Sequence, residues 1–99
     1  MSPLTIEDYP GLLEIVWERV KQVTIKDRSV EDDVKYNTQG ELIRGAMYIL
    51  QLETEWPETW NDEYRQKVDT YDNKKRLVVA GALIAAELDR VIYLENKKE

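Results

Sequence analysis

The sequence predicts an all-α fold: a bundle of three main helices, with a short extra helix in a tryptophan-bearing loop, that assembles into an oligomer. Two observations carry this prediction. Apolar residues recur at helical spacing in three segments, and the last of these segments is apolar nearly all round. A long polar stretch that contains two tryptophans separates the second segment from the third. At 99 residues, the chain is expected to form a single helical domain, residues 1–99.

The first helix is predicted to begin at Pro10, because proline is well tolerated at the first helical position and Thr5 and Asp8 precede it. Its helically spaced apolar residues predict a core-facing side: Leu12, Leu13, Val16, Trp17, Val20 and Val23. Trp17 is therefore expected in the core, and Glu14, Glu18 and Lys21 are expected on the solvent side. Residues 27–37 have the composition of a polar connection.

The second helix is predicted to open with a capping box, in which the Thr38 hydroxyl accepts an early N–H and Glu41 reaches back three residues. Gly45 lies inside this helix. A mid-helix glycine costs about 1 kcal/mol relative to alanine, so another group is expected to approach Gly45 closely.

The loop over residues 53–70 is interrupted by Pro57 and is expected to contain a short helix, residues 61–68, capped by Asn61. The third main helix should start near Asp72 or Asn73 and run to about Asn96.

Two neighbouring helices cannot cover a helix that is apolar nearly all round, which predicts a homo-oligomer, at least a dimer. The small residues Gly81, Ala82, Ala85 and Ala86 would allow close helix–helix approach. Ala82 or Ala86 is expected at a close contact, so that arginine there should dissociate or unfold the protein.

Composition excludes several functions. The chain has no cysteine and no histidine, so it lacks disulfides, thiol nucleophiles, imidazole bases and the usual zinc ligands. A net charge of −6 argues against duplex nucleic acid as a partner. There is no membrane-length apolar run and no signal-peptide pattern, so a cytoplasmic protein without a cofactor or membrane partner is expected.

Two groups of residues are candidates for binding a small anionic nucleotide. Trp56 and Trp60 could stack on a base, or they could plug the end of the helical core. A phosphate could be held by basic residues that include a cluster at a helix N-terminus, where cations oppose the helix dipole: Arg44, Lys74, Lys75 and Arg76. Alternatively, these cations form a solvated face.

The carboxylates give a second hypothesis. Glu41, Glu87 and Asp33 could together hold Mg²⁺, as carboxylates do in the all-α nucleotide pyrophosphohydrolases. Glu87 and Asp89 are two residues apart and point in different directions, so the paired spacing of those enzymes is missing. The alternative is that Glu41 serves as a cap and Glu87 pairs with Arg90. No catalytic residue is predicted.

Several blocks resemble a widespread family of small phage and prophage proteins, most of them without an assigned function. The blocks are Gly40-Glu41-Leu42, Trp56-Pro57, Arg76-Leu77-Val78, and Ala80 to Ile84 followed by Ala86-Glu87, Asp89 and Arg90. The resemblance covers roughly residues 14–90. In the family, a histidine usually follows a pair of aspartates. This chain departs from that pattern, because Val34 and Lys35 follow Asp32-Asp33.

Small helical phage proteins that sequester cyclic-nucleotide immune signals are similar in size and composition. These resemblances imply a viral accessory, anti-defence protein that binds a nucleotide in the host cytoplasm without converting it. A Mg²⁺-dependent pyrophosphohydrolase relative and a protein–protein adaptor are the alternatives.

Overall fold

The computed structural model describes residues 5–24 and 29–97, and all regular structure in these ranges is helical. A 3-10 helix, η1 (Ile6–Asp8), precedes five α-helices: α1 (Pro10–Thr24), α2 (Val30–Tyr36), α3 (Glu41–Ile49), α4 (Asp62–Val68) and α5 (Asn73–Asn96). The predicted all-α class is confirmed. Within these ranges, no helix has the length and apolar character needed to cross a membrane.

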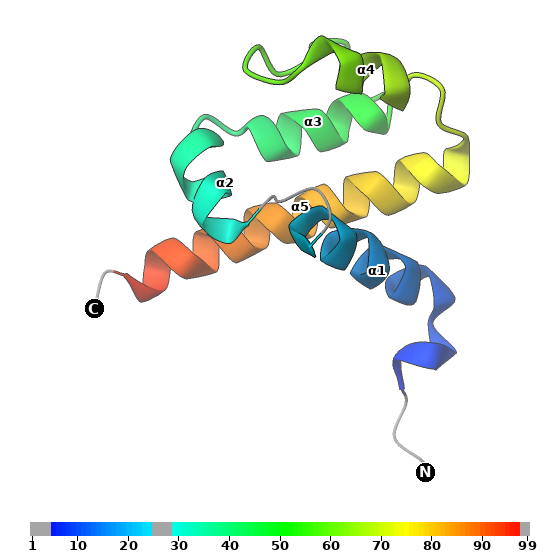
Figure 1. Cartoon of the computed structure of the whole chain (residues 1–99). Coiled ribbons are helices and arrows are strands. Elements are labelled where there is room, and N and C mark those ends of the chain that lie inside the picture. The colour runs from blue at the N-terminus through cyan, green and yellow to red at the C-terminus, as the bar shows by residue number, and fades with distance from the viewer. Residues whose placement is uncertain (1–4, 25–28, 98–99) are drawn as a thin grey trace.

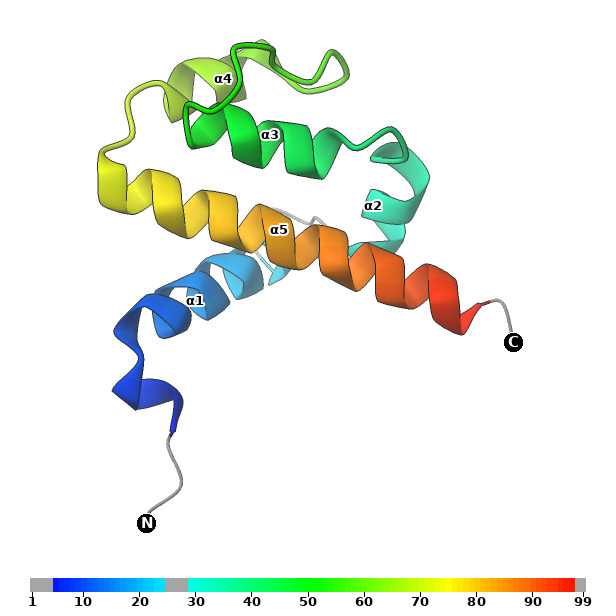
Figure 2. The same cartoon turned by 180° about the vertical axis from the view of Figure 1, so that it is seen from behind.

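Helix α5 is the centre of the fold and contacts α1, α2 and α3. Figures 1 and 2 show α3 along one side of α5 and α1 crossing the other side, with α4 lying beyond α3. The Asp72 side chain caps α5 by accepting a hydrogen bond from the Lys75 N–H at 2.8 Å. This cap agrees with the helix start predicted from the sequence.

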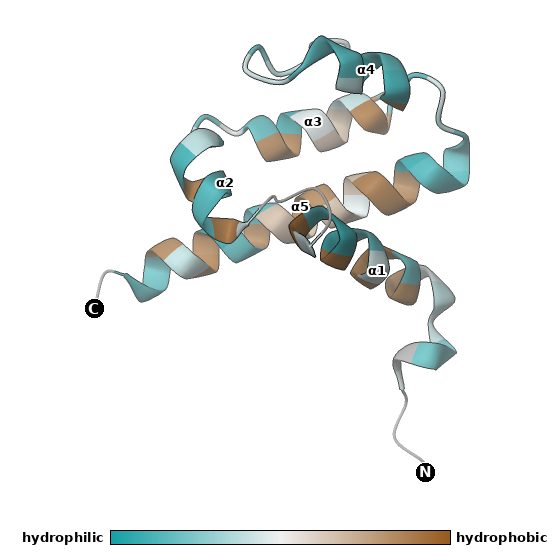
Figure 3. Cartoon of the chain, in the orientation of Figure 1, coloured by the Kyte–Doolittle hydropathy of each residue, from teal (hydrophilic) through white to brown (hydrophobic). Residues whose placement is uncertain are grey.

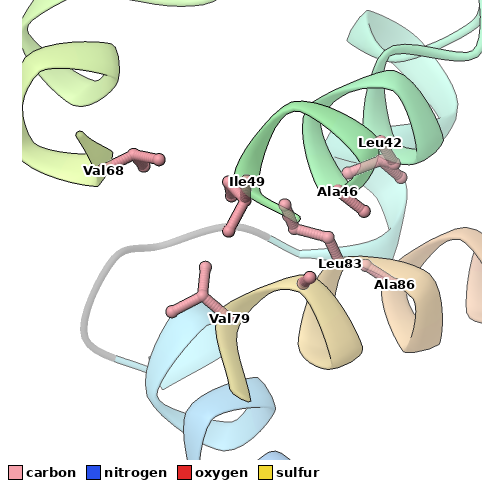
Figure 4. Packing of buried hydrophobic residues seen from close by; sticks show 8 residues of the cluster. Leu42, Ala46, Ile49, Val68, Val79, Leu83 and Ala86 are labelled. Carbon is pink, nitrogen blue, oxygen red and sulfur yellow. The ribbon is translucent and has the colours of Figure 1, made fainter. Parts of the chain in front are cut away.

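The core lies between α3 and α5. Figure 4 shows Leu42, Ala46 and Ile49 of α3 facing Val79, Leu83 and Ala86 of α5, and Val68 of α4 and Ala80 of α5 complete the buried cluster. None of the described residues of α1 or α2 belongs to it. Ala82 and Ala86 are 0% and 2% exposed, so their small side chains are buried within one chain. The expectation that one of them lies at a close contact is confirmed, and that contact is within one chain.

The predicted orientation of α1 was also wrong. Trp17 is 60% exposed, whereas Glu18 and Gln22 are the buried residues of this helix. Glu18 faces α5 because Lys75 bonds it there at 3.3 Å, and Lys21 lies 3.5 Å from the same carboxylate oxygen. The buried side of α1 is therefore the one that carries Glu18 and Gln22, and the apolar stripe is left outside.

Helix α2 falls within the segment expected to be an irregular connection. Its seven residues carry little apolar periodicity, and the Ser29 side chain caps it by accepting from the Asp32 N–H at 3.1 Å. The predicted short helix α4 is confirmed, since the Asn61 side chain accepts from the Glu63 N–H at 2.6 Å.

The predicted threonine cap of α3 was wrong. Gly40 is the N-cap residue, with φ of +79°, and no side chain caps that end. The positive φ turns the chain so that the helix begins at Glu41 rather than two residues earlier. The Glu41 carboxylate does reach back, but it accepts from the Gln39 N–H.

Candidate functional site

A pocket of about 550 Å³ opens between α1, α2, α5 and the loop from α3 to α4 that carries Trp56 and Trp60, which we call the tryptophan loop. We call it the α1–α2 pocket. Its volume is within the usual range for small-molecule sites. Its lining combines amide, charged and aromatic side chains over an apolar floor: Arg19, Gln22, Asp32, Asp33, Tyr36, Asn37, Leu42, Thr59, Trp60, Asn61, Tyr64, Leu83 and Ala86.

The aromatic wall of the pocket is fixed by Trp60. The Trp60 indole N–H donates to Asn37 Oδ1 at 2.8 Å, which ties the tryptophan loop to the end of α2. The ring lies directly on Gly45 of α3, where a Cβ would come within 2.2 Å of the indole. The close approach predicted at Gly45 is therefore confirmed. Tyr64 stands beside this indole, with ring centroids 6.0 Å apart.

The other tryptophan of the loop has a supporting position. Trp56 packs against the core and meets Trp60, Tyr48 and Tyr64 edge-on, with centroids 5.0–5.5 Å apart. Edge-to-face pairs contribute about 0.5–1.5 kcal/mol each beyond burial. Trp56 therefore stiffens the wall, and Trp60 is the indole that lines the pocket.

Two residues of α1 that line the pocket carry buried N–H donors without a hydrogen-bond partner among residues 5–24 and 29–97. Gln22 is 1% exposed, and no described residue accepts from its Nε2. Arg19 uses Nε and Nη2 on Asp89 Oδ2, each at 3.1 Å, and its buried Nη1 has no hydrogen bond to a described residue. A buried polar group without a partner costs about 1–3 kcal/mol. These donors are therefore suited to an acceptor atom of a bound molecule, such as a phosphate or carbonyl oxygen.

Acidic residues of α2 form the opposite part of the lining. Asp33 is 4% exposed, and its Oδ1 accepts from Asn37 Nδ2 at 2.8 Å, while Asp32 is exposed. Negative charge here favours a ligand that also carries N–H donors, and it opposes a ligand with a long chain of phosphates.

The predicted basic cluster does not line this pocket. Lys74 pairs with Glu14 at 3.8 Å, and Lys75 pairs with Glu18 and lies over the Tyr71 ring. Both lysines line a separate hollow of about 420 Å³ beside α1.

The two predicted arginines hold backbone carbonyls. The Arg76 guanidinium donates to the carbonyls of Ile49, Tyr71 and Asp69 at 2.9–3.3 Å and so closes the end of α3 onto α5. Arg44 donates to the Gln39 carbonyl at 2.9 Å. Of the six residues predicted to bind a ligand, Trp60 lines the α1–α2 pocket and the other five lie elsewhere.

The three carboxylates considered for magnesium have separate partners. Glu87 pairs with Arg90, as one reading of the sequence expected, and Glu41 lies 3.9 Å from Arg44. Asp33 is on α2, bonded to Asn37. Over residues 5–24 and 29–97, no three acidic side chains are grouped so that they could hold a metal ion.

The sequence reasoning missed Arg19, Gln22, Asn37 and Tyr64. The signal for the first two was present, because Glu18 and Gln22 share one face of α1 with Arg19 beside them. A continuous apolar stripe on the other side of α1 led to the prediction that the apolar side faces the core. Asn37 could not be placed without knowing that residues 30–36 form a helix.

Searches against protein-family models, curated proteins and solved structures find no match to this chain.

Proposed function

We propose that the protein binds and sequesters a small anionic nucleotide in the α1–α2 pocket without converting it. The observation that carries the proposal is the pairing of unsatisfied buried donors, Gln22 Nε2 and Arg19 Nη1, with the rigid aromatic wall of Trp60 in one pocket. The donors fit phosphate or carbonyl oxygens, and an aromatic wall suits a base, for which stacking contributes about 1–3 kcal/mol.

The acidic part of the lining refines the ligand. Base N–H groups can donate to carboxylates such as Asp33, whereas each added phosphate increases repulsion. We therefore expect a nucleoside monophosphate or a cyclic nucleotide to bind more tightly than the triphosphate of the same base. This preference agrees with the small nucleotide signal that the sequence resemblance implies.

The proposal is tested by calorimetry with mono-, di-, tri- and cyclic nucleotides. Arg19→Gln and Gln22→Leu should each weaken binding about tenfold or more, because each removes a donor to the ligand. Lys74→Ala is the matched control: its ammonium group pairs with Glu14 away from the pocket and should not affect affinity. The absence of binding by any nucleotide would contradict the proposal, and a loss confined to Lys74→Ala would return the site to the start of α5.

Gln22→Leu also separates function from folding. Leucine is similar in size and has no unpaired amide, so the variant should be at least as stable as the wild type while it loses the ligand. A thermal denaturation of both proteins without nucleotide measures this. A marked loss of stability would show that the amide serves the fold instead.

The alternative is a Mg²⁺-dependent pyrophosphohydrolase. The separate engagements of Glu41, Glu87 and Asp33 favour binding over catalysis. Steady release of pyrophosphate from a nucleoside triphosphate with Mg²⁺, abolished by Glu87→Gln, would reverse this preference.

A further inference from the structure

Helix α1 presents its apolar residues to solvent. Leu12, Val16, Val20 and Val23 are 37–52% exposed, and they form one stripe at spacings of three and four residues. The side of α1 that faces α5 is polar apart from Ile15, whose side chain lies against Gly81. No segment within residues 5–24 and 29–97 covers this stripe.

Helix α5 carries a matching stripe. Leu77, Ile84, Leu88 and Val91 are 37–58% exposed and repeat at intervals of seven, four and three residues. Val91 is 14 steps along the helix from Leu77, so this stripe is about 21 Å long at 1.5 Å per step. It lies apart from the α5 face that packs on α3, which holds Val79, Leu83 and Ala86.

Both stripes open on one side of the molecule. Figures 1 and 2 show α1 and α5 running in the same direction and crossing, with the N-terminal end of α1 and the C-terminal end of α5 diverging like the arms of an inverted V. Ile15 of α1 lies against Gly81, which is four residues after Leu77 and three before Ile84 on α5, so α1 borders the α5 stripe there. Figure 3 shows the apolar colour along the lower edge of α1, away from α3.

We infer that this surface, which we call the V face, is where a second copy of the chain packs in a two-fold symmetric dimer. The eight residues of the two stripes are aliphatic, although the chain is 34% charged and has a net charge of −6. Arg19, on the same row of α1 between Val16 and Val23, is paired with Asp89 within the chain. Two copies can therefore meet here without placing like charges together. An isologous interface requires a self-complementary patch, and an apolar one meets that condition.

Other occupants fit less well. Arg19, beside the α1 stripe, is neutralised within the chain by Asp89 at 3.1 Å and so is not free to pair with a charged protein partner. An anionic lipid surface attracts helices with basic flanks. At the start of α5, however, Lys74 and Lys75 pair with Glu14 and Glu18, and Arg76 holds backbone carbonyls. The radius of gyration of 14.5 Å exceeds the roughly 13 Å usual for a 100-residue domain, as expected for a subunit opened toward a partner.

Light scattering after size-exclusion chromatography at micromolar concentration tests the inference. The wild type should be a dimer. Val20→Glu and Leu88→Glu should each raise the dissociation constant of the dimer at least tenfold, so that monomer forms at higher protein concentration on dilution. Both side chains are about half exposed in the single chain, so the helical circular dichroism should persist. Leu52→Glu is the control, because Leu52 is 71% exposed on the loop after α3, outside the V face, and should leave the dimer intact.

A second measurement does not depend on disruptive variants. Because the chain has no cysteine, Leu88→Cys provides a single site for a nitroxide label, with Leu52→Cys as its counterpart. The label at 88 should be immobilised at high concentration and released on dilution, while the label at 52 should not change. A monomeric wild type, a dimer that survives both V-face substitutions, or a monomer that sediments with vesicles of phosphatidylcholine and phosphatidylserine would each overturn the inference.

Discussion

Gly45 is the residue on which the tryptophan loop rests. A Cβ there would lie 2.2 Å and 2.4 Å from Cζ3 and Cη2 of Trp60, two atoms of a ring already held by its bond to Asn37. We expect Gly45→Ala to lower the free energy of unfolding by about 1–3 kcal/mol through overpacking, even though alanine favours helix by about 1 kcal/mol.

Urea denaturation measures the Gly45 effect, and Gly11→Ala is its matched control. A Cβ at Gly11 in α1 meets nothing within 4 Å, so this substitution should leave stability unchanged or raise it by up to about 1 kcal/mol. If both variants were stabilised alike, Trp60 would not pack as described.

Tyr48 couples stability to alkaline pH. Burial, together with the hydrogen bond from its hydroxyl to Asp69 Oδ1 at 2.9 Å, raises the pKa of this phenol above its ordinary value of 10.0. A group whose folded pKa is raised stabilises the fold fully below its unfolded pKa, and that contribution is lost as the pH rises above 10.0 through the folded pKa.

The corresponding experiment compares the wild type with Tyr48→Phe. Wild-type stability should fall more steeply with pH above about 10, because only the wild type must deprotonate this phenol. Denaturation at a series of pH values, with ultraviolet titration of the tyrosines, measures it. Parallel pH profiles for the two proteins would rule out the coupling.

At the scale of elements, the start of α3 shows how glycine replaces a side-chain cap. The sequence offered Thr38 and Glu41 as a capping box, but Gly40 at φ of +79° shifts the helix start and leaves Thr38 exposed. Glu41 is 2% exposed and bonds the Gln39 N–H, so its carboxylate holds the turn.

We therefore expect Glu41→Ala to cost about 1–3 kcal/mol, since it leaves a backbone N–H without its acceptor, and Thr38→Ala to cost less than about 0.5 kcal/mol as an ordinary surface change. Thermal denaturation of the two variants compares these costs. A larger loss of stability in Thr38→Ala than in Glu41→Ala would support the threonine cap instead.

The other helices show what the sequence can and cannot predict. Helices α1, α4 and α5 were predictable, because local signals near their starts (Pro10, Asn61 and Asp72) coincide with periodic or helix-forming residues. Which side of α1 faces inward was not, because an apolar stripe is buried equally well in a subunit core or between subunits. The pocket was not predicted for the same reason, because Arg19 and Gln22 line it from the polar side of α1.

For the whole molecule, α1 links the V face to the α1–α2 pocket. Its outer stripe belongs to the V face, and Arg19 and Gln22 on its inner side carry the pocket donors. The buried core between α3 and α5 includes no described residue of α1, so few apolar contacts within one chain hold this helix. Segments with few buried apolar contacts open at low free energy.

The second copy should therefore order the site as well as cover the stripe. We predict that Leu88→Glu, which lies on α5 and does not line the pocket, weakens nucleotide binding several-fold as it dissociates the dimer. The physical reason is that apparent affinity falls with the fraction of chains whose α1 is in the binding position. Calorimetry across a range of protein concentrations measures this, and wild-type affinity should decline on dilution toward that of the variant. Equal affinity in monomer and dimer would show that α1 is held by its ion pairs to Lys75 and Asp89 alone, and the pocket would then be complete in one chain.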